Sequence, residues 1–160
     1  MEIRVAKPWE LESIIHIEQE CFPPAEAASA KEFAERYAAF PENFIVAVIN
    51  DQVVGFINGA TTDHPDLPDE LYHDTSLHKP NGAYQTVFGL DVLPSYRNQG
   101  IAAKLLRYLI TLSKERGKSG MVLTCKDHLV SYYEKFGFEH QGVSASSHGG
   151  SKWNDMLFLF

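Results

Sequence analysis

The chain has 160 residues, 44% of them hydrophobic, so it is long enough to bury a core without metal or disulfide support. Its formal net charge of −7 argues against nucleic acid as the main partner and suits a cationic small molecule. No segment reaches the roughly 18 consecutive apolar residues of a membrane span, and no N-terminal signal pattern is present.

Cysteine and histidine usage indicates the compartment and the absence of a metal site. Cys21 and Cys125 are expected to be buried thiols in a reducing cytoplasm rather than a disulfide. The seven histidines never fall into a metal-ligand spacing, so no metal is expected. His128, His140 and His148 are expected on the surface or in loops.

The first third of the chain predicts a strand and two helices. Residues 2–6 alternate as a short strand, and a helix opens at Pro8 and ends at the two prolines after Phe22. Ser29 is the expected N-cap of a second helix, which runs through about residue 39. Glu32 completes its capping box three residues on.

The next segments predict a hairpin and a long loop. Residues 44–49 form a continuous apolar strand, and Asn50-Asp51 turns the chain into a partner strand over 52–59. Residues 61–82 are polar, acidic and interrupted by proline, which predicts a loop with one helical turn at most. A loop this long inside a compact domain is either functional or a solvated insertion.

The second half alternates strands and helices. The predicted elements are a central strand over 84–93, a helix over 101–116, a buried strand over 121–125, a helix capped by Asp127, and strands near 139–143 and 153–159. The order β-α-α-β-β-β-α-β-α-β-β indicates a mixed α/β sheet of the α+β kind. We expect one domain over 1–160, without repeat or linker.

The loop before the helix at 101 indicates an anion site. Residues 97–102 read Arg-x-x-Gly-x-Ala, and such a loop lets backbone N–H groups converge at a helix N-terminus, where a pyrophosphate can be held. Gly100 and Ala102 leave room for close approach, and Arg97 adds a permanent cation. The pattern predicts a phosphorylated cofactor that is held mainly by backbone groups.

Two motifs together resemble a known enzyme family. Leu-x-Val-x-Pro-x-x-Arg-x-x-Gly-x-Ala over 90–102 is similar to the acetyl-coenzyme A signature of the GCN5-related N-acetyltransferases (GNAT). Tyr-Tyr-Glu-Lys-Phe-Gly-Phe over 132–138 resembles a second segment of that family. The resemblance implies a central, mostly antiparallel seven-stranded sheet flanked by about four helices. It also implies acetyl-CoA as co-substrate, and no metal.

The resemblance assigns the cofactor contacts residue by residue. Backbone contacts to the pantetheine arm fall on Leu90, Asp91 and Val92. The pyrophosphate contacts fall on Arg97, Asn98, Gln99, Gly100, Ile101, Ala102 and Ala103. Leu90 and Val92 are equally explained as core residues, and both roles can hold because backbone and side chain act independently.

A closer resemblance concerns the acceptor. The segments 77–82 and 125–134 resemble the arylalkylamine (serotonin) N-acetyltransferase branch. Vertebrate members carry two histidines at the positions of Thr86 and Phe88, so their histidine base has no counterpart here. Thr86, Phe88 and Phe22 are expected to line the acceptor site. Glu26, in the loop that walls this site in the family, is the preferred base, although it could also be an exposed loop carboxylate.

The leaving thiolate needs a proton, and the resemblance assigns its donor to Tyr133. A phenol is a suitable donor to a thiolate. A buried aromatic on the helix face is the competing explanation, because Tyr133 shares that face with Tyr132.

Three functions remain open from the sequence. The preferred one is acetyl-CoA-dependent N-acetylation of a small primary amine, with arylalkylamines among the candidates, by direct transfer. The alternatives are an acyl-CoA-binding protein with little catalysis, and an acetyltransferase for a peptide N-terminus or a polyamine. The partner is expected to be the small-molecule amine, with no nucleic acid or membrane, and the chain a monomer or homodimer.

Overall fold

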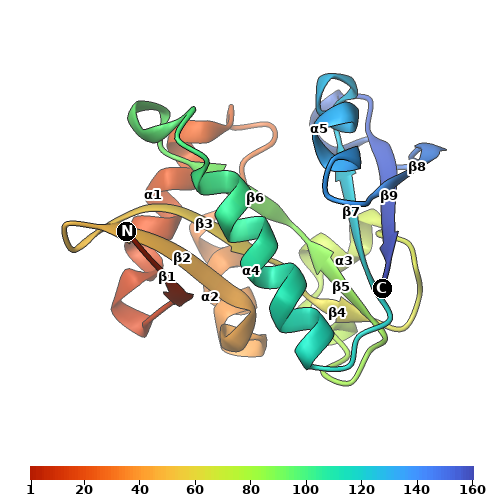
Figure 1. The fold of residues 1–160 in the computed structure, drawn as a ribbon, viewed down its shortest axis with the longest axis horizontal. Coiled ribbons are helices and arrows are strands. Elements are labelled where there is room, and N and C mark those ends of the chain that lie inside the picture. Colours follow the sequence, from red (N-terminus) through yellow and green to blue (C-terminus); the bar gives the residue numbers. More distant parts are fainter.

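The computed structural model describes residues 1–160 (Figure 1). Its helices are α1 (Leu11–Cys21), α2 (Ala30–Ala39), α3 (Asp69–His73), α4 (Ile101–Glu115) and α5 (Val130–Glu134). Its strands are β1 (Glu2–Val5), β2 (Phe44–Ile49), β3 (Gln52–Asn58), β4 (Thr61–Thr62), β5 (Tyr84–Val87), β6 (Gly89–Val92), β7 (Gly120–Cys125), β8 (Glu139–Val143) and β9 (Asn154–Leu159). No helix combines the length and the apolar composition needed to cross a bilayer.

The strands form two sheets. One has the order β1-β2-β3-β6, and the other has the order β4-β5-β7-β9-β8. Every neighbouring pair is antiparallel except β5 and β7, so the expected mixed, mostly antiparallel architecture is confirmed. Figure 1 shows the first sheet with α1 and α2 on one side of the molecule and the second sheet on the other, with α4 between them.

The prediction of one continuous strand over 84–93, in a single seven-stranded sheet, was wrong. The strand is interrupted at Phe88, whose N–H still donates to the Asn58 carbonyl at 2.7 Å; β5 before it pairs with β4 and β7, and β6 after it pairs with β3. Close packing holds the branch point: a Cβ on Gly59 would lie 1.9 Å from the carbonyl oxygen of Thr86. Only glycine allows this approach of two backbones. The sheets therefore meet at Gly59 and separate beyond it.

Several local predictions are confirmed by capping and turn geometry. The Ser29 hydroxyl accepts the Glu32 N–H at 3.1 Å, and the Glu32 carboxylate accepts the Ser29 N–H at 3.2 Å, which is the expected capping box. Asn50 and Asp51 have φ of 50° and 64°, as a tight hairpin turn requires. Asp127 does not cap α5; its carboxylate accepts the side-chain amide of Asn154 at 2.8 Å instead.

Two apolar layers cover the first sheet. The larger one lies under α4, where Leu105, Leu106 and Leu109 are fully buried against strands of both sheets. The smaller one joins α1 and α2 to β2 and β3 through Ile14 and Phe33. The segment 61–82 is more ordered than expected, since it contains β4, α3 and a short 3₁₀ turn.

Candidate active site

A backbone edge lies open where the sheets separate. β6 pairs with β3 along one side, and no ladder forms on its other side. β7 pairs with β5 only over 120–123 and with β9, which leaves its last residues open on the same side. Leu90, Asp91 and Val92, the expected backbone contacts, thus lie on a strand with a free edge. An extended ligand could bind there as an additional strand.

A helix N-terminus stands at the end of this edge. Asn98 and Gly100 have positive φ, 64° and 78°, which turn the backbone so that α4 begins directly after the loop. The first N–H groups of α4, including those of Ile101, Ala102 and Ala103, have no intrahelical acceptor. A Cβ on Gly100 would meet nothing within 4 Å. The expected pyrophosphate loop is therefore exposed and accessible.

Arg97 was expected to place its positive charge at the pyrophosphate loop, but its guanidinium contacts β6 and α1 instead. Its Nε donates to the Val92 carbonyl at 3.1 Å, and its Nη2 lies 3.4 Å from the Cys21 sulfur. The guanidinium is thus bound to the end of β6 and to α1. From there it still adds positive charge next to the loop.

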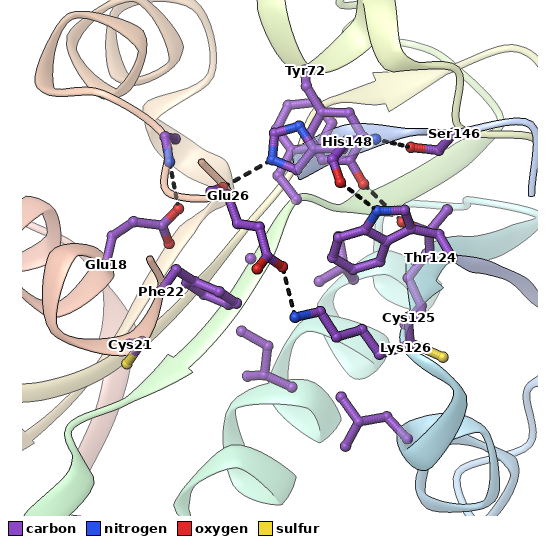
Figure 2. A pocket seen from close by; sticks show the side chains of 18 of the residues that line it. Glu18, Cys21, Phe22, Glu26, Tyr72, Thr124, Cys125, Lys126, Ser146 and His148 are labelled. Carbon is purple, nitrogen blue, oxygen red and sulfur yellow. Dashed lines mark hydrogen bonds and ion pairs between the residues drawn. The ribbon is translucent and has the colours of Figure 1, made fainter. Parts of the chain in front are cut away.

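A cavity of about 280 Å³ continues from the open edge (Figure 2). Its wall comes from the end of α1 and the loop after it, α2, α3, the β5–β6 junction, β7, α5 and the loop 146–153. Of the expected acceptor residues, Phe22 and Phe88 line it. Thr86 is fully buried outside the wall, where its hydroxyl donates to the Ala60 carbonyl at 2.7 Å.

One side of the cavity is aromatic. The rings of Tyr72 and Phe88 have centroids 4.7 Å apart, and Tyr72 lies nearly parallel to His148 at 5.9 Å. The Tyr72 hydroxyl is 3.1 Å from the Thr124 hydroxyl, which fixes the ring across the two segments. Trp153 closes this side, with its indole N–H donating to the His148 carbonyl at 2.8 Å.

Glu26 points into the cavity from the loop after α1 (Figure 2). Its Oε1 lies 2.7 Å from the Lys126 ammonium, and its side chain is only 9% exposed. His148 donates from Nε2 to the Glu26 carbonyl at 2.9 Å. The structure thus brings Glu26 into the cavity wall as an ion-paired carboxylate, and not as an exposed one.

Tyr133 reaches the same cavity from α5. It packs edge-to-face against Tyr132 at 5.3 Å and against Phe138 at 5.9 Å. Burial is the main cause that raises its pKa well above that of a free phenol. Tyr133 therefore stays protonated through the neutral range. The Tyr133 side chain therefore both packs in the core and reaches the cavity.

Sequence reasoning missed several residues of the wall. These are Glu18, Arg36, Tyr72, Lys126, His128, His148 and Trp153. His128 and His148 lie in short 3₁₀ turns between the longer elements, consistent with the expected surface or loop positions, and both also line the cavity. Tyr72 lies in the long loop whose function was left open. A pattern in the sequence could not find them because they come from separate loops that only the fold brings together.

Fold and site together define a class of group-transfer enzyme. A sheet with one open edge and a free helix N-terminus lies beside a polar and aromatic cavity. The family model for the acetyltransferase (GNAT) family matches residues 11–138. The chain belongs to this family.

The most informative curated relative is a serotonin N-acetyltransferase from Mesocricetus auratus, 32% identical over 152 residues. The alignment covers 92% of this chain and 72% of that protein. An uncharacterized N-acetyltransferase of Bacillus subtilis is 27% identical, and the alignment covers 72% of this chain and 56% of that protein.

Among solved structures, a GNAT-like decarboxylase in complex with isobutyryl-CoA matches with a TM-score of 0.86 and 19% identity, covering 99% of both chains. A GNAT acetyltransferase from Brucella melitensis in complex with acetyl-CoA matches with a TM-score of 0.64 and 20% identity, covering 99% of this chain and 87% of the other. These two likenesses concern the fold.

Proposed function

We propose that the chain transfers an acetyl group from acetyl-CoA directly to a small primary amine. The observation that carries this proposal is the continuity between the open edge of β6, the free N-terminus of α4 and the carboxylate-lined cavity. The serotonin N-acetyltransferase relative supports an amine acceptor. We further propose one N-acetyltransferase domain over 1–160, acting as a monomer or homodimer.

The residues present fit the coenzyme. The open edge of β6, at Leu90, Asp91 and Val92, offers backbone groups to an extended arm, except the Val92 carbonyl, which already accepts from Arg97 and Cys21. The loop 97–100 is exposed and ends in the first N–H groups of α4, which favour a pyrophosphate. When bound, the thioester would supply the activated acetyl group. The remaining chemistry falls to side chains of the cavity.

Glu26 is proposed to take the proton that makes the amine reactive. An alkylamine with a pKa near 10.4 is neutral in only about one molecule in 2,500 at about pH 7. Deprotonation must therefore be assisted. Glu26 reaches the cavity as a carboxylate paired with Lys126, and we propose that the proton passes to it from the amine through water.

Tyr133 is proposed to protonate the sulfur. The amine nitrogen forms its bond to the acetyl carbon as the carbon–sulfur bond breaks, and the electron pair leaves on sulfur. The Tyr133 hydroxyl then donates its proton to this thiolate, and the second proton of the nitrogen restores the phenol through water. Tyr133 is protonated at neutral pH and so has a proton to donate, while its raised pKa makes it a weaker acid than a free phenol.

The aromatic wall supports an arylalkylamine as acceptor. Tyr72, Phe88, His148 and Trp153 form one continuous aromatic side, and Phe22 lies near Glu26 on the loop after α1. Offset or edge-to-face contacts with a substrate ring add about 0.5–1.5 kcal/mol each. A peptide N-terminus or a polyamine would leave this side unused. A cytoplasmic location is supported by the free thiols of Cys21 and Cys125.

A thiol-release assay with a panel of amines tests the function. The panel contains 2-phenylethylamine, tryptamine, a polyamine, a short peptide and aliphatic amines of matched length. We expect turnover with the amines and a higher kcat/KM for the aryl members. Coenzyme binding without turnover on any amine would instead establish an acyl-CoA-binding protein.

A further inference from the structure

Beside the cavity, two buried carboxyl groups lie together. Glu18 on α1 is 6% exposed and lines the cavity, and Asp91 on β6 is 2% exposed behind it. Glu18 Oε2 accepts the Ala28 N–H at 2.8 Å. No N–H or hydroxyl group of the protein donates to Glu18 Oε1 or to either carboxylate oxygen of Asp91. Three of the four carboxylate oxygens thus lack the hydrogen-bond donor that buried polar atoms normally have.

A third unsatisfied group faces the same place. Asn58 on β3 is fully buried, and both atoms of its side-chain amide are without a partner. A Cβ added to Gly89 would lie 3.3 Å from Asp91 Oδ1, 3.7 Å from Glu18 Oε1 and 3.8 Å from Asn58 Oδ1. Three oxygen atoms thus converge on the space that a side chain at position 89 would occupy. Gly89 itself lines the cavity.

The charges around Glu18 and Asp91 decide which kind of ligand these side chains can bind. Two carboxylates this deeply buried cannot both ionise without large cost, and a hydrogen bond between them requires a shared proton. Burial first, and then Glu18, raise the pKa of Asp91 well above its usual range. Cys21 raises it further, and Arg97 opposes the shift. Glu18 interacts through its charge with Arg36 on α2.

We propose that Glu18 and Asp91 form an acid pair that binds the ammonium group of the acceptor amine over Gly89 and releases its shared proton when the cation binds. The pair with one proton carries a single negative charge. Binding of R–NH₃⁺ converts it to two carboxylates and sends one proton to solvent, so that charge and atoms balance. Asn58 Oδ1 supplies a third acceptor for the ammonium hydrogens.

This role differs from that of Glu26. Glu26 already has a cationic partner in Lys126, whereas neither Glu18 nor Asp91 forms a salt bridge, and Glu18 lines the cavity. The pair would therefore select a charged amine over a neutral analogue. This inference rests on the proposed function, because it requires an amine acceptor.

Proton release is measured by calorimetry. The amine that turns over fastest in the panel is titrated into the enzyme–coenzyme A complex, where the missing acetyl group prevents turnover. Titrations in two buffers of different ionisation enthalpy, at several pH values from about 5 to 8, give the protons released. We expect a maximum of up to one proton per amine, at pH values between the pKa of Asp91 with the cation bound and its raised pKa without the cation. The alcohol analogue should release none.

Variants assign the proton to the pair. Asp91→Asn should abolish the release, while Glu20→Gln, on the exposed side of the same helix, should leave it unchanged. Glu18→Gln should raise the KM of the amine about ten- to a hundredfold, since a buried hydrogen bond to a charged group contributes about 1.5–3 kcal/mol. Gly89→Ala, which keeps both carboxyl groups, should raise the KM by filling the space between them.

Two results would overturn the proposal. One is amine turnover by the wild-type enzyme with no proton release at any pH; the other is a release that Asp91→Asn does not change. Both leave the proposed acetyl transfer intact, because that function is judged by thiol release alone. Failure of every amine to react would instead remove the function itself.

Discussion

The Lys126 ammonium and the Glu26 carboxylate meet at 2.7 Å and join the two halves of the cleft. Glu26 belongs to the loop between α1 and α2, which packs with the first sheet, and Lys126 directly follows β7 of the second sheet. Lys126 also lies 5.7 Å from the centre of the Trp153 ring. A change at either side chain therefore loosens a contact that spans the site.

Glu26→Gln should reduce turnover at about pH 7 and less so at about pH 9.5, where the amine approaches its own pKa and needs less help. Initial rates of the two enzymes at both pH values give the comparison. Lys126→Gln is the matched control, since it breaks the same ion pair and keeps the carboxylate. Equal, pH-independent defects in both variants would assign Glu26 to structure.

Tyr133→Phe should lower kcat by about 10² to 10⁴, the usual contribution of general acid catalysis, with little change in coenzyme affinity. Tyr132→Phe is the neighbouring control, because Tyr132 packs on Tyr133 but does not line the cavity. Steady-state rates and calorimetric binding measure the two effects. Wild-type turnover of Tyr133→Phe across the pH range would leave this tyrosine with a packing role only.

Gly100→Glu should weaken coenzyme binding strongly, because it places a negative charge at the N-terminus of α4 beside the expected phosphates. Gly117→Glu is the control for backbone strain: Gly117 has φ of 77°, close to the 78° of Gly100, and lies at the other end of α4. Calorimetry on both folded variants measures the difference. Equal affinities would place the phosphates elsewhere.

Phe22→Leu should lower kcat/KM for aryl amines about 2- to 12-fold, the equivalent of one lost aromatic contact of about 0.5–1.5 kcal/mol. Aliphatic amines of the same length should react as before, since leucine preserves an apolar wall. The ratio of the two specificity constants measures this effect. A loss shared by both amine types would show that Phe22 shapes the site without selecting rings.

Asp91→Asn should change how stability depends on pH. Because the pKa of Asp91 is higher in the folded protein than in the unfolded chain, its contribution is favourable at low pH and is lost as pH rises through the folded value. The neutral amide avoids this loss, so the variant should gain stability relative to wild type from about pH 5 to about pH 8. Urea denaturation at both pH values tests the trend, with exposed Asp63→Asn as the control.

Local signals in the sequence were sufficient for most elements of the fold. The capping box at Ser29 and the turn at Asn50-Asp51 are chemical instructions carried by neighbouring residues, and both appear as predicted. The break at Phe88 has no such local signal. It depends on Gly59, about thirty residues earlier in the chain, which lets β3 approach Thr86 so closely. A contact between distant segments cannot be found from the periodicity of either one.

The residues of the candidate site also fall into two groups: those that a local sequence pattern indicates and those that only the fold brings together. The start of α4 after Gly100 was predictable because the glycine, the alanine and the helix are consecutive, and the cofactor contacts of residues 97–103 remain predictions. Glu26 and Tyr133 reach the cavity, and their catalytic roles remain predictions. Glu18 and Asp91 appeared as a helix residue and a strand residue, and their burial beside each other follows only from the packing of α1 on β6.

The unpaired edge of β6 has a consequence for the protein when coenzyme is scarce. An exposed strand edge is a template for pairing with other chains, and natural proteins usually protect such edges by charge, by covering segments or by shortness. β6 has only four residues, and a bound ligand would cover its remaining unpaired backbone groups. Coenzyme supply would then govern solubility and lifetime of this enzyme in the cell as well as its rate.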